Sequence, residues 1–309
     1  FKQKTAYEIK ECDWSSDVCS SDLSRPYVYI HDEIGTDKRN PRVNANGPLY
    51  GAPEWSSDYV PVFDPRTNTA REIKLPVRDP RTITSRDDPM YADSPYWGAE
   101  RIYDSQTSPH NPMMDHKRRA WFTQRIRNSR NPEWCEKGDH PSVKALPMRQ
   151  SARQLSFYDP ETKKVTLIDT CFSTHHLQFA EDTNHTLWLS TGFGGNGGNE
   201  AIGWLNTKMF DETGDEKASQ GWTALVLDTN GNGKRDAYVG PRDAVDPTKD
   251  KRILASLYGI AYNPVDGSIW GSVVAFPGAV VRILPGPDPA NTAISEIYEV
   301  PFNDPRTPH

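Results

Sequence analysis

The sequence has no long apolar run and no concentration of one charge. None of its apolar stretches approaches the roughly 20 residues that a membrane-spanning helix needs, so no transmembrane segment is expected. Lys and Arg total 36 against 42 Asp and Glu, and no segment gathers the basic residues into a patch. A mildly acidic chain of this kind lacks the electrostatic footprint of a nucleic-acid-binding protein. We therefore expect neither nucleic acid nor an anionic membrane surface as a partner.

Apolar residues are also scarce, at 35% of the chain, whereas prolines number 26. So many prolines argue against long helices, because each one removes a backbone donor and disrupts a helix interior. Short strands joined by long polar loops explain both features.

The first 23 residues do not resemble a natural N-terminus. Residues 1–9 read FKQKTAYEI and residues 13–23 read DWSSDVCSSDL. Both strings resemble conceptual translations of a short-read sequencing adapter, with a barcode between them, as in a contaminated metagenomic assembly. The alternative is a natural polar arm, and the segment lacks the regions of a signal peptide. We expect residues 1–23 to be an artefact and the native N-terminus, with any signal peptide, to be missing.

Two cysteines remain beyond that segment, Cys135 and Cys171. In an exported protein they would pair as a disulfide and tie a long loop to the strand that follows it. A buried pair of free thiols is the alternative, and we favour the disulfide.

Tryptophan-bearing hairpins recur along the chain. Each has an apolar strand, a turn rich in Asp, Asn or Gly, and a second strand that carries Trp121, Trp188 or Trp270. A second kind of hairpin follows, with an Asp-Pro or Pro-Gly turn between alternating strands, and Asp-Pro suits a type I turn. This second hairpin is found at 59–76, 153–170 and 279–301. Two hairpins in succession make a four-stranded antiparallel sheet, which is one blade of a β-propeller.

We therefore predict an all-β fold, a partial β-propeller over residues 24–309. About four blades are expected, the first incomplete, and truncation of a larger propeller explains the small number. A β-sandwich with coincidental tryptophans is the alternative. The predicted blades are at 24–76, 100–170, 171–250 and 253–301, with long loops near 125–152, 192–200 and 207–252.

Two of these blocks, HHLQFAEDTNHTLWLS and RQLSFYDPETKKVTLI, resemble blades of the virginiamycin B (streptogramin) lyases and of NHL-type propellers. The resemblance implies a seven-bladed propeller that is secreted or periplasmic. It also implies, for the lyases, opening of a cyclic depsipeptide ester by elimination, with a histidine base and a magnesium ion. No block fixes the register of the catalytic blades, so no catalytic residue is assigned from the family.

In a propeller, the first strand of each blade lines the central channel. His110, His176 and Tyr258 stand at equivalent positions, 11 or 12 residues before their tryptophans, and are expected to converge as tentative catalytic residues. They could orient a substrate, ligate a metal or supply a general base. The alternative is that each histidine satisfies a backbone carbonyl. His175 is expected to point to the opposite face, because side chains alternate along a strand.

The segment DTNGNGKRD resembles a calcium-binding loop. The expected ligands stand at loop positions 1, 3, 5, 7 and 9, the seventh through its backbone carbonyl. Position 12 is Val239, which cannot supply a carboxylate, so we expect a structural calcium ion of modest affinity, or an Asn-Gly turn without an ion. The five candidate ligands are Asp228, Asn230, Asn232, Lys234 and Asp236.

Two functions follow from these observations. The first is a binding platform in the cell envelope, with its site at the central channel and a small molecule, a glycan or an envelope protein as partner. The second is a lyase-like enzyme that opens a cyclic ester or peptide with a histidine base and a metal ion. Convergence of His110 and His176 on an open rim beside acidic residues would favour the enzyme, and buried rings with every nitrogen bonded to backbone would favour the platform.

Overall fold

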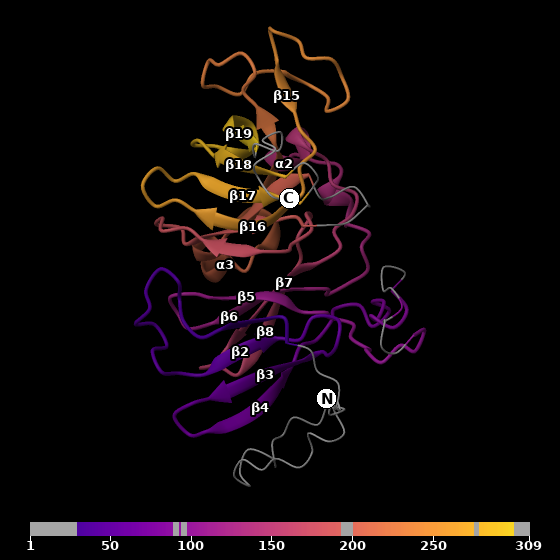
Figure 1. The fold of residues 1–309 in the computed structure, drawn as a ribbon, viewed down its shortest axis with the longest axis vertical. Coiled ribbons are helices and arrows are strands. Elements are labelled where there is room, and N and C mark those ends of the chain that lie inside the picture. The colour runs from indigo at the N-terminus through magenta and orange to yellow at the C-terminus, as the bar shows by residue number, and fades with distance from the viewer. Residues whose placement is uncertain (1–29, 89–92, 94–97, 193–199, 275–277, 300–309) are drawn as a thin grey trace, which may run out of the picture. The chain divides into compact units, whose positions relative to one another are not determined.

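The computed structural model describes residues 30–88, 93, 98–192, 200–274 and 278–299. Residues 1–23, matched above to an adapter, lie outside this range, as does most of the predicted loop 192–200. The chain divides into two compact units (Figure 1). Unit 1 comprises Phe1–Asn128 and Leu155–Ile168, and unit 2 comprises Ser129–Gln154 and Asp169–His309.

Unit 1 contains two four-stranded antiparallel sheets with strands in sequence order. The first consists of β1 (Asp32–Ile34), β2 (Leu49–Ala52), β3 (Tyr59–Asp64) and β4 (Thr69–Lys74). The second consists of β5 (His110–Met114), β6 (Ala120–Gln124), β7 (Gln154–Asp159) and β8 (Lys164–Ile168). Both Asp-Pro turns form as predicted, because the Asp64 and Asp159 carboxylates accept backbone N–H groups two residues on.

Alternation along these strands builds the core of unit 1. Val60 and Val62 in β3 are 1% and 2% exposed, whereas Phe63, which points to the opposite face of the sheet, is 37% exposed. The buried side chains of the first sheet pack with Met114, Ala120 and Phe122 of the second. The two sheets therefore share one apolar interior, and the loops at the strand ends are held in fixed positions.

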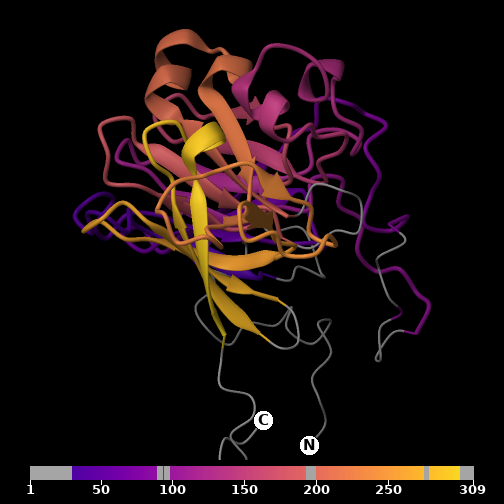
Figure 2. The same cartoon turned by 90° about the horizontal axis from the view of Figure 1, so that it is seen from above.

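Unit 2 contains a third four-stranded sheet and a larger fourth one (Figures 1 and 2). The third consists of β9 (Leu177–Phe179), β10 (Thr186–Ser190), β11 (Ala201–Asn206) and β12 (Gln220–Ala224). Two short helices, α3 (Thr207–Thr213) and α4 (Glu216–Ser219), connect β11 to β12.

The fourth sheet is built on β16 (Leu257–Tyr262), β17 (Ile269–Val273), β18 (Ala279–Leu284) and β19 (Ile294–Glu299). Helix α5 (Pro289–Thr292) precedes β19. Beyond β19 come three short strands, in the spatial order β13 (Val226–Leu227), β15 (Asp250–Arg252) and β14 (Tyr238–Val239). The predicted loop 207–252 thus supplies β12, this three-stranded extension and two of the helices.

The segment that leads into β7 carries the 3₁₀ helix η2 (Glu133–Cys135) and helix α2 (Pro141–Ala145). Cys135 is joined to Cys171 by a disulfide, with Cα atoms 5.4 Å apart. The indole of Trp222 in β12 donates to the Leu146 carbonyl and stacks on His140. This part of the predicted loop 125–152 is therefore fastened to the third sheet both covalently and by packing.

The all-β class and the four-stranded antiparallel sheets are confirmed, and the four sheets match the predicted number of blades. Residues 32–74, expected to supply an incomplete blade, form a sheet with all four strands. Of the three hairpin tryptophans, Trp121 and Trp188 are buried, whereas Trp270 is partly exposed. In the described part of the chain, no helix has the length and apolar character needed to cross a membrane. The size of the whole propeller stays a prediction.

Candidate functional site

Four polar side chains meet at the strand ends of unit 1. His31 precedes β1, Asp32 begins β1, Glu54 follows β2, and His110 begins β5. Asp32 lies opposite Ala52 in the β1–β2 ladder, and His31 N–H donates to the Ala52 carbonyl. This pairing brings the residues after β2 beside those before β1. We call these four residues the His–carboxylate cluster.

The donor atoms of the His–carboxylate cluster are close together. Oδ2 of Asp32 lies 2.8 Å from Nδ1 of His31 and 3.8 Å from Nδ1 of His110. Oε2 of Glu54 lies 3.3 Å from the same nitrogen of His110. The rings of His31 and His110 are 4.6 Å apart between centroids. One ligand atom from each of His31, Asp32 and His110 fits within a span of 4.8 Å.

One side of the cluster is open to solvent and the other is buried. The His110 side chain is 1% exposed and that of Glu54 is 12% exposed. The side chains of His31 and Asp32 are 26% and 30% exposed. A ligand can therefore reach the cluster past His31 and Asp32, while His110 and Glu54 close its inner wall.

Strained backbone surrounds the cluster. Trp55, Ser108 and Asn111 have φ values of 63°, 42° and 41°, in the left-handed region that bulky residues rarely occupy. Trp55 N–H donates to Ser108 Oγ, and Ser85 Oγ donates to the Trp55 carbonyl. Such conformations persist only where the surroundings enforce them, and they concentrate at functional sites.

This donor set suits a transition metal ion. Ligand atoms bound tetrahedrally at about 2.0–2.1 Å stand roughly 3.3 Å apart, and the separations from Asp32 to His31 and to His110, 2.8 and 3.8 Å, lie on either side of that value. Imidazole with carboxylate favours zinc, manganese or iron, and catalytic zinc sites often use two histidines and one carboxylate. Magnesium, which the family resemblance implies, prefers oxygen ligands and does not fit two imidazoles.

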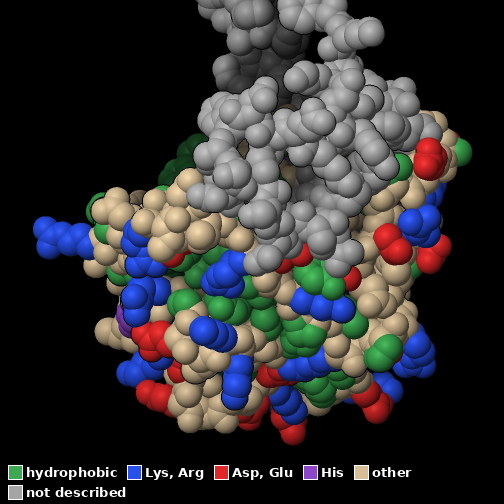
Figure 3. All heavy atoms as spheres, turned by 90° about the horizontal axis from the view of Figure 1, so that it is seen from below, with side chains coloured by type: hydrophobic (Ala, Val, Ile, Leu, Met, Phe, Trp, Pro, Cys, Tyr) green, Lys and Arg blue, Asp and Glu red, His purple; other side chains and the backbone are tan. Residues whose placement is uncertain are grey.

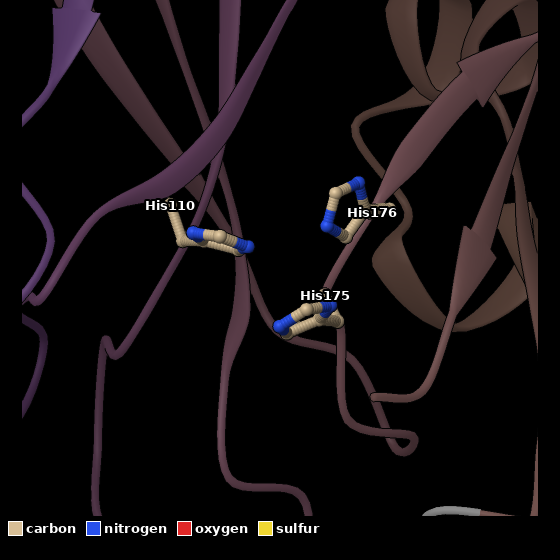
Figure 4. Close-up of side chains that lie close together, drawn as sticks. All are labelled: His110, His175 and His176. Carbon is tan, nitrogen blue, oxygen red and sulfur yellow. The ribbon is translucent and has the colours of Figure 1, made fainter. Parts of the chain in front are cut away.

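Unit 2 carries a cluster of rings of its own. His176 and Tyr258 have ring centroids 4.5 Å apart, and His175 lies 4.9 Å from Tyr258 and 4.7 Å from His176. Figure 4 shows His175 and His176 on the segment that leads into β9. The prediction that His175 would point away is wrong, because both histidines precede β9 and strand alternation does not apply to them.

The structure thus brings two of the three tentative catalytic residues together, His176 and Tyr258. His110 belongs to unit 1, where its neighbours are His31, Asp32 and Glu54, so its convergence with the other two stays a prediction. The adjacent donors His31 and Asp32 at the start of the first strand were a signal in the sequence. Glu54 gave no signal, since its position depends on sheet packing.

The predicted calcium loop folds around two acidic side chains. The Asp228 carboxylate accepts hydrogen bonds from the backbone N–H groups of Gly231 and Gly233. The side-chain amides of Asn230 and Asn232 both donate to Oδ2 of Asp236, and these bonds lower the pKa of the Asp236 carboxyl. Calcium binding itself stays a prediction.

Surface charge on one face of unit 1 is mixed. Figure 3 shows Lys and Arg side chains interspersed with Asp and Glu and with apolar side chains wherever the described atoms are visible. Unit 1 also pairs opposite charges directly, as in the Asp64–Arg66 ion pair with 2.7 Å between Oδ2 and Nη2. This face therefore carries no single-sign field that would attract a polyanion.

The sequence matches no protein-family model and no curated protein. Its fold is similar to that of XC5397, a gluconolactonase from Xanthomonas campestris, at 12% identity over 88% of this chain and 63% of that one, with a TM-score of 0.41. A streptogramin B lyase is 12% identical over 92% of this chain and 72% of that one, with a TM-score of 0.34. A putative 6-phosphogluconolactonase from Bacteroides uniformis is 12% identical over 87% and 53%, with the same TM-score. The chain spans less than two thirds of the gluconolactonase.

Proposed function

We propose that unit 1 binds a divalent transition metal ion and that the protein is a metal-dependent enzyme that opens an ester or lactone. The observation that carries the proposal is the proximity of two imidazoles and two carboxylates at the ends of β1, β2 and β5. His110 lies beside two acidic residues, Asp32 and Glu54, and this part of the arrangement expected for an enzyme supports the proposal.

Each side chain has a role in this proposal. His31, Asp32 and His110 hold the ion, which when bound would supply Lewis-acid polarisation of a carbonyl oxygen. Glu54 accepts a proton, either from an attacking water in hydrolysis or from the substrate carbon in elimination. The buried wall formed by His110 and Glu54 keeps bulk water away from this proton transfer.

Metal binding and turnover test the proposal separately. The full chain is treated with a chelator and titrated calorimetrically with Zn²⁺ or Mn²⁺, and hydrolysis or elimination is followed on a panel of lactones and cyclic esters. We expect His110→Ala to lose metal binding and turnover together. Glu54→Gln should retain the ion but lose turnover by about 10²-fold or more, as for removal of a general base.

His185→Ala is the matched control, since His185 lies in the β9–β10 turn and belongs to neither cluster. It should leave metal binding and turnover unchanged. Unaltered metal affinity in His110→Ala would refute the metal centre, and turnover that survives complete chelation would refute the metal-dependent reaction.

The ring cluster of unit 2 favours a second candidate, a binding platform for a small molecule or glycan. Three partly exposed rings within 5 Å of one another offer flat faces and polar edges to a ligand. Tyr258→Ala should weaken such binding while turnover on the ester panel persists.

Fractionation of cells expressing the complete gene tests the predicted periplasmic or extracellular location.

A further inference from the structure

The predicted calcium loop 228–236 connects β13 to β14, two neighbours of β15 in the fourth sheet. β13 pairs antiparallel with β15, and β14 pairs parallel with β15 from the other side. The two ends of the loop therefore stand on either side of one strand. The first residue of that strand, at the base of the loop, is Asp250.

Hydrogen bonds and strand pairing hold β15 against both ends of the loop, with Asp250 at the C-terminal end. Its Oδ2 accepts from Asp236 N–H at 2.7 Å, and its own N–H donates to the Ala237 carbonyl. On the other side, Leu227 pairs with Lys251 in the ladder, and Thr229 Oγ1 donates to the Lys249 carbonyl. The carboxylate of Asp250 thus faces the last ligand position of the loop.

The Asp250 carboxylate is buried and only half satisfied. The residue is 0% exposed, and its Oδ1 has no hydrogen-bond partner among the residues that the structure describes. A buried carboxylate oxygen without a donor or cation is costly, so such groups are normally paired or coordinate a metal. This oxygen is an observation independent of the loop's own motif and hydrogen bonds.

We propose that Asp250 supplies the carboxylate ligand that the loop lacks at its twelfth position, and that the loop with Asp250 forms a calcium site. Asp228, Asn230, Asn232, Asp236 and the Lys234 carbonyl provide five oxygen ligands, and Asp250 provides the sixth. Calcium takes six to eight oxygen ligands, so one or two waters complete the shell. The ligand from a different strand replaces the bidentate glutamate that Val239 cannot supply.

The proposed ion joins the loop to the sheet that carries it. Asp228 and Asp236 stand on the loop and Asp250 stands on β15, so a bound calcium ion would crosslink the loop to the strand that it flanks and fix the extension at the edge of the fourth sheet. Its affinity should fall in the extracellular range, a Kd of about 10⁻⁴–10⁻³ M, as for weakly chelating extracellular modules.

Calorimetric titration of the chelator-treated full chain with CaCl₂ tests the proposal, together with the melting temperature with and without calcium. The chain should bind one calcium ion in the stated range and melt at a higher temperature when the ion is bound. Asp250→Asn should weaken calcium binding by at least about tenfold, which is the scale of removing a group that supports a metal site. It should not lower the melting temperature of the calcium-free protein, because it removes a buried charge with no counter-ion.

Asp243→Asn is the matched control, with the same charge change in an exposed turn of the same unit. It should bind calcium as the unaltered chain does. If Asp250→Asn folds poorly, Asp228→Asn tests the site at the first ligand position of the loop. This variant too should bind calcium more weakly. The proposal is overturned if the chain binds no calcium at 10 mM, on the order of ten times the weakest expected Kd. It is also overturned if Asp250→Asn or Asp228→Asn retains full affinity.

Discussion

The Glu54 carboxylate lies 3.3 Å from Nδ1 of His110, although Glu54 follows β2 of the first sheet and His110 begins β5 of the second. The link between them is a hydrogen bond from Trp55 N–H to Ser108 Oγ. Both Trp55 and Ser108 hold left-handed backbone, so the turn after β2 and the turn before β5 are fixed against each other. The His–carboxylate cluster is therefore preorganised by the backbone on which it stands.

Replacing Ser108 by Ala tests this preorganisation. The variant leaves the Trp55 N–H without its acceptor, so we expect a loss of about 1–3 kcal/mol in unfolding free energy. Metal affinity at the cluster should fall by about 10-fold or more, because supporting groups of metal sites have effects of that size. Urea unfolding and calorimetric titration with Zn²⁺ measure the two effects.

Thr67→Ala in the exposed β3–β4 turn is the control for Ser108→Ala, and its unfolding free energy should change by no more than roughly 0.5 kcal/mol. If Ser108→Ala lost stability but bound Zn²⁺ as tightly as before, the turn would support the fold and not the site.

Features that depend on residues adjacent in the sequence could be predicted from it. Features that depend on contacts between distant segments could not. The tryptophan hairpins and the Asp-Pro turns are local patterns, so they identified four sheets. The histidine flagged at position 110 was found, but its partners Glu54 and His31 were not, because their approach depends on how the first two sheets of unit 1 pack. Asp250 was missed for a similar reason, since only the pairing of three strands brings it to the calcium loop.

The Cys135–Cys171 disulfide should contribute substantially to the stability of unit 2. It closes a loop with a sequence separation of 36, for which restriction of the unfolded chain predicts a contribution of about 2–4 kcal/mol. The double variant Cys135→Ala/Cys171→Ala should lose that amount in urea unfolding. Dithiothreitol should lower the stability of the unaltered chain by a similar amount and leave the double variant unaffected. Equal sensitivity of both proteins to the reductant would contradict the assignment.

A buried ion pair in the β5–β6 turn should be far more sensitive to mutation than an exposed one. Oδ2 of Asp115 accepts from Arg119 Nε at 2.6 Å and from the Trp121 indole at 2.8 Å, and the side chains of the ion pair are 1% and 7% exposed. Asp115→Asn leaves the Arg119 charge buried without its counter-ion, so we expect a loss of about 3–5 kcal/mol.

The exposed pair Asp64–Arg66 provides the comparison for Asp115→Asn. Asp64→Asn removes the same kind of charge from a pair in which Arg66 is 60% exposed, and it should change stability little. Chemical denaturation of both variants measures the difference. Similar losses in the two variants would show that the Arg119 charge is solvated in solution.

His140 should make the stability of unit 2 depend on pH. Its Nε2–H donates to the Gln220 carbonyl, its Nδ1 accepts from Ser142 N–H at the start of α2, and burial lowers the pKa of the ring below its usual value. Protonation would place a hydrogen on Nδ1 facing the Ser142 N–H and break the helix cap.

Because the folded-state pKa of His140 is lowered, the unfolded chain takes up the proton first. The stabilisation is therefore complete above about pH 6.5 and declines as the pH falls below that value. The variant His140→Asn tests this, because asparagine can cap α2 without titrating. Between about pH 7.5 and 5, a window around the usual histidine pKa of about 6.5, its unfolding free energy should fall less steeply than that of the unaltered chain. His185→Asn, in an exposed turn, should follow the unaltered chain, and an identical pH profile for His140→Asn would contradict the assigned hydrogen bonds.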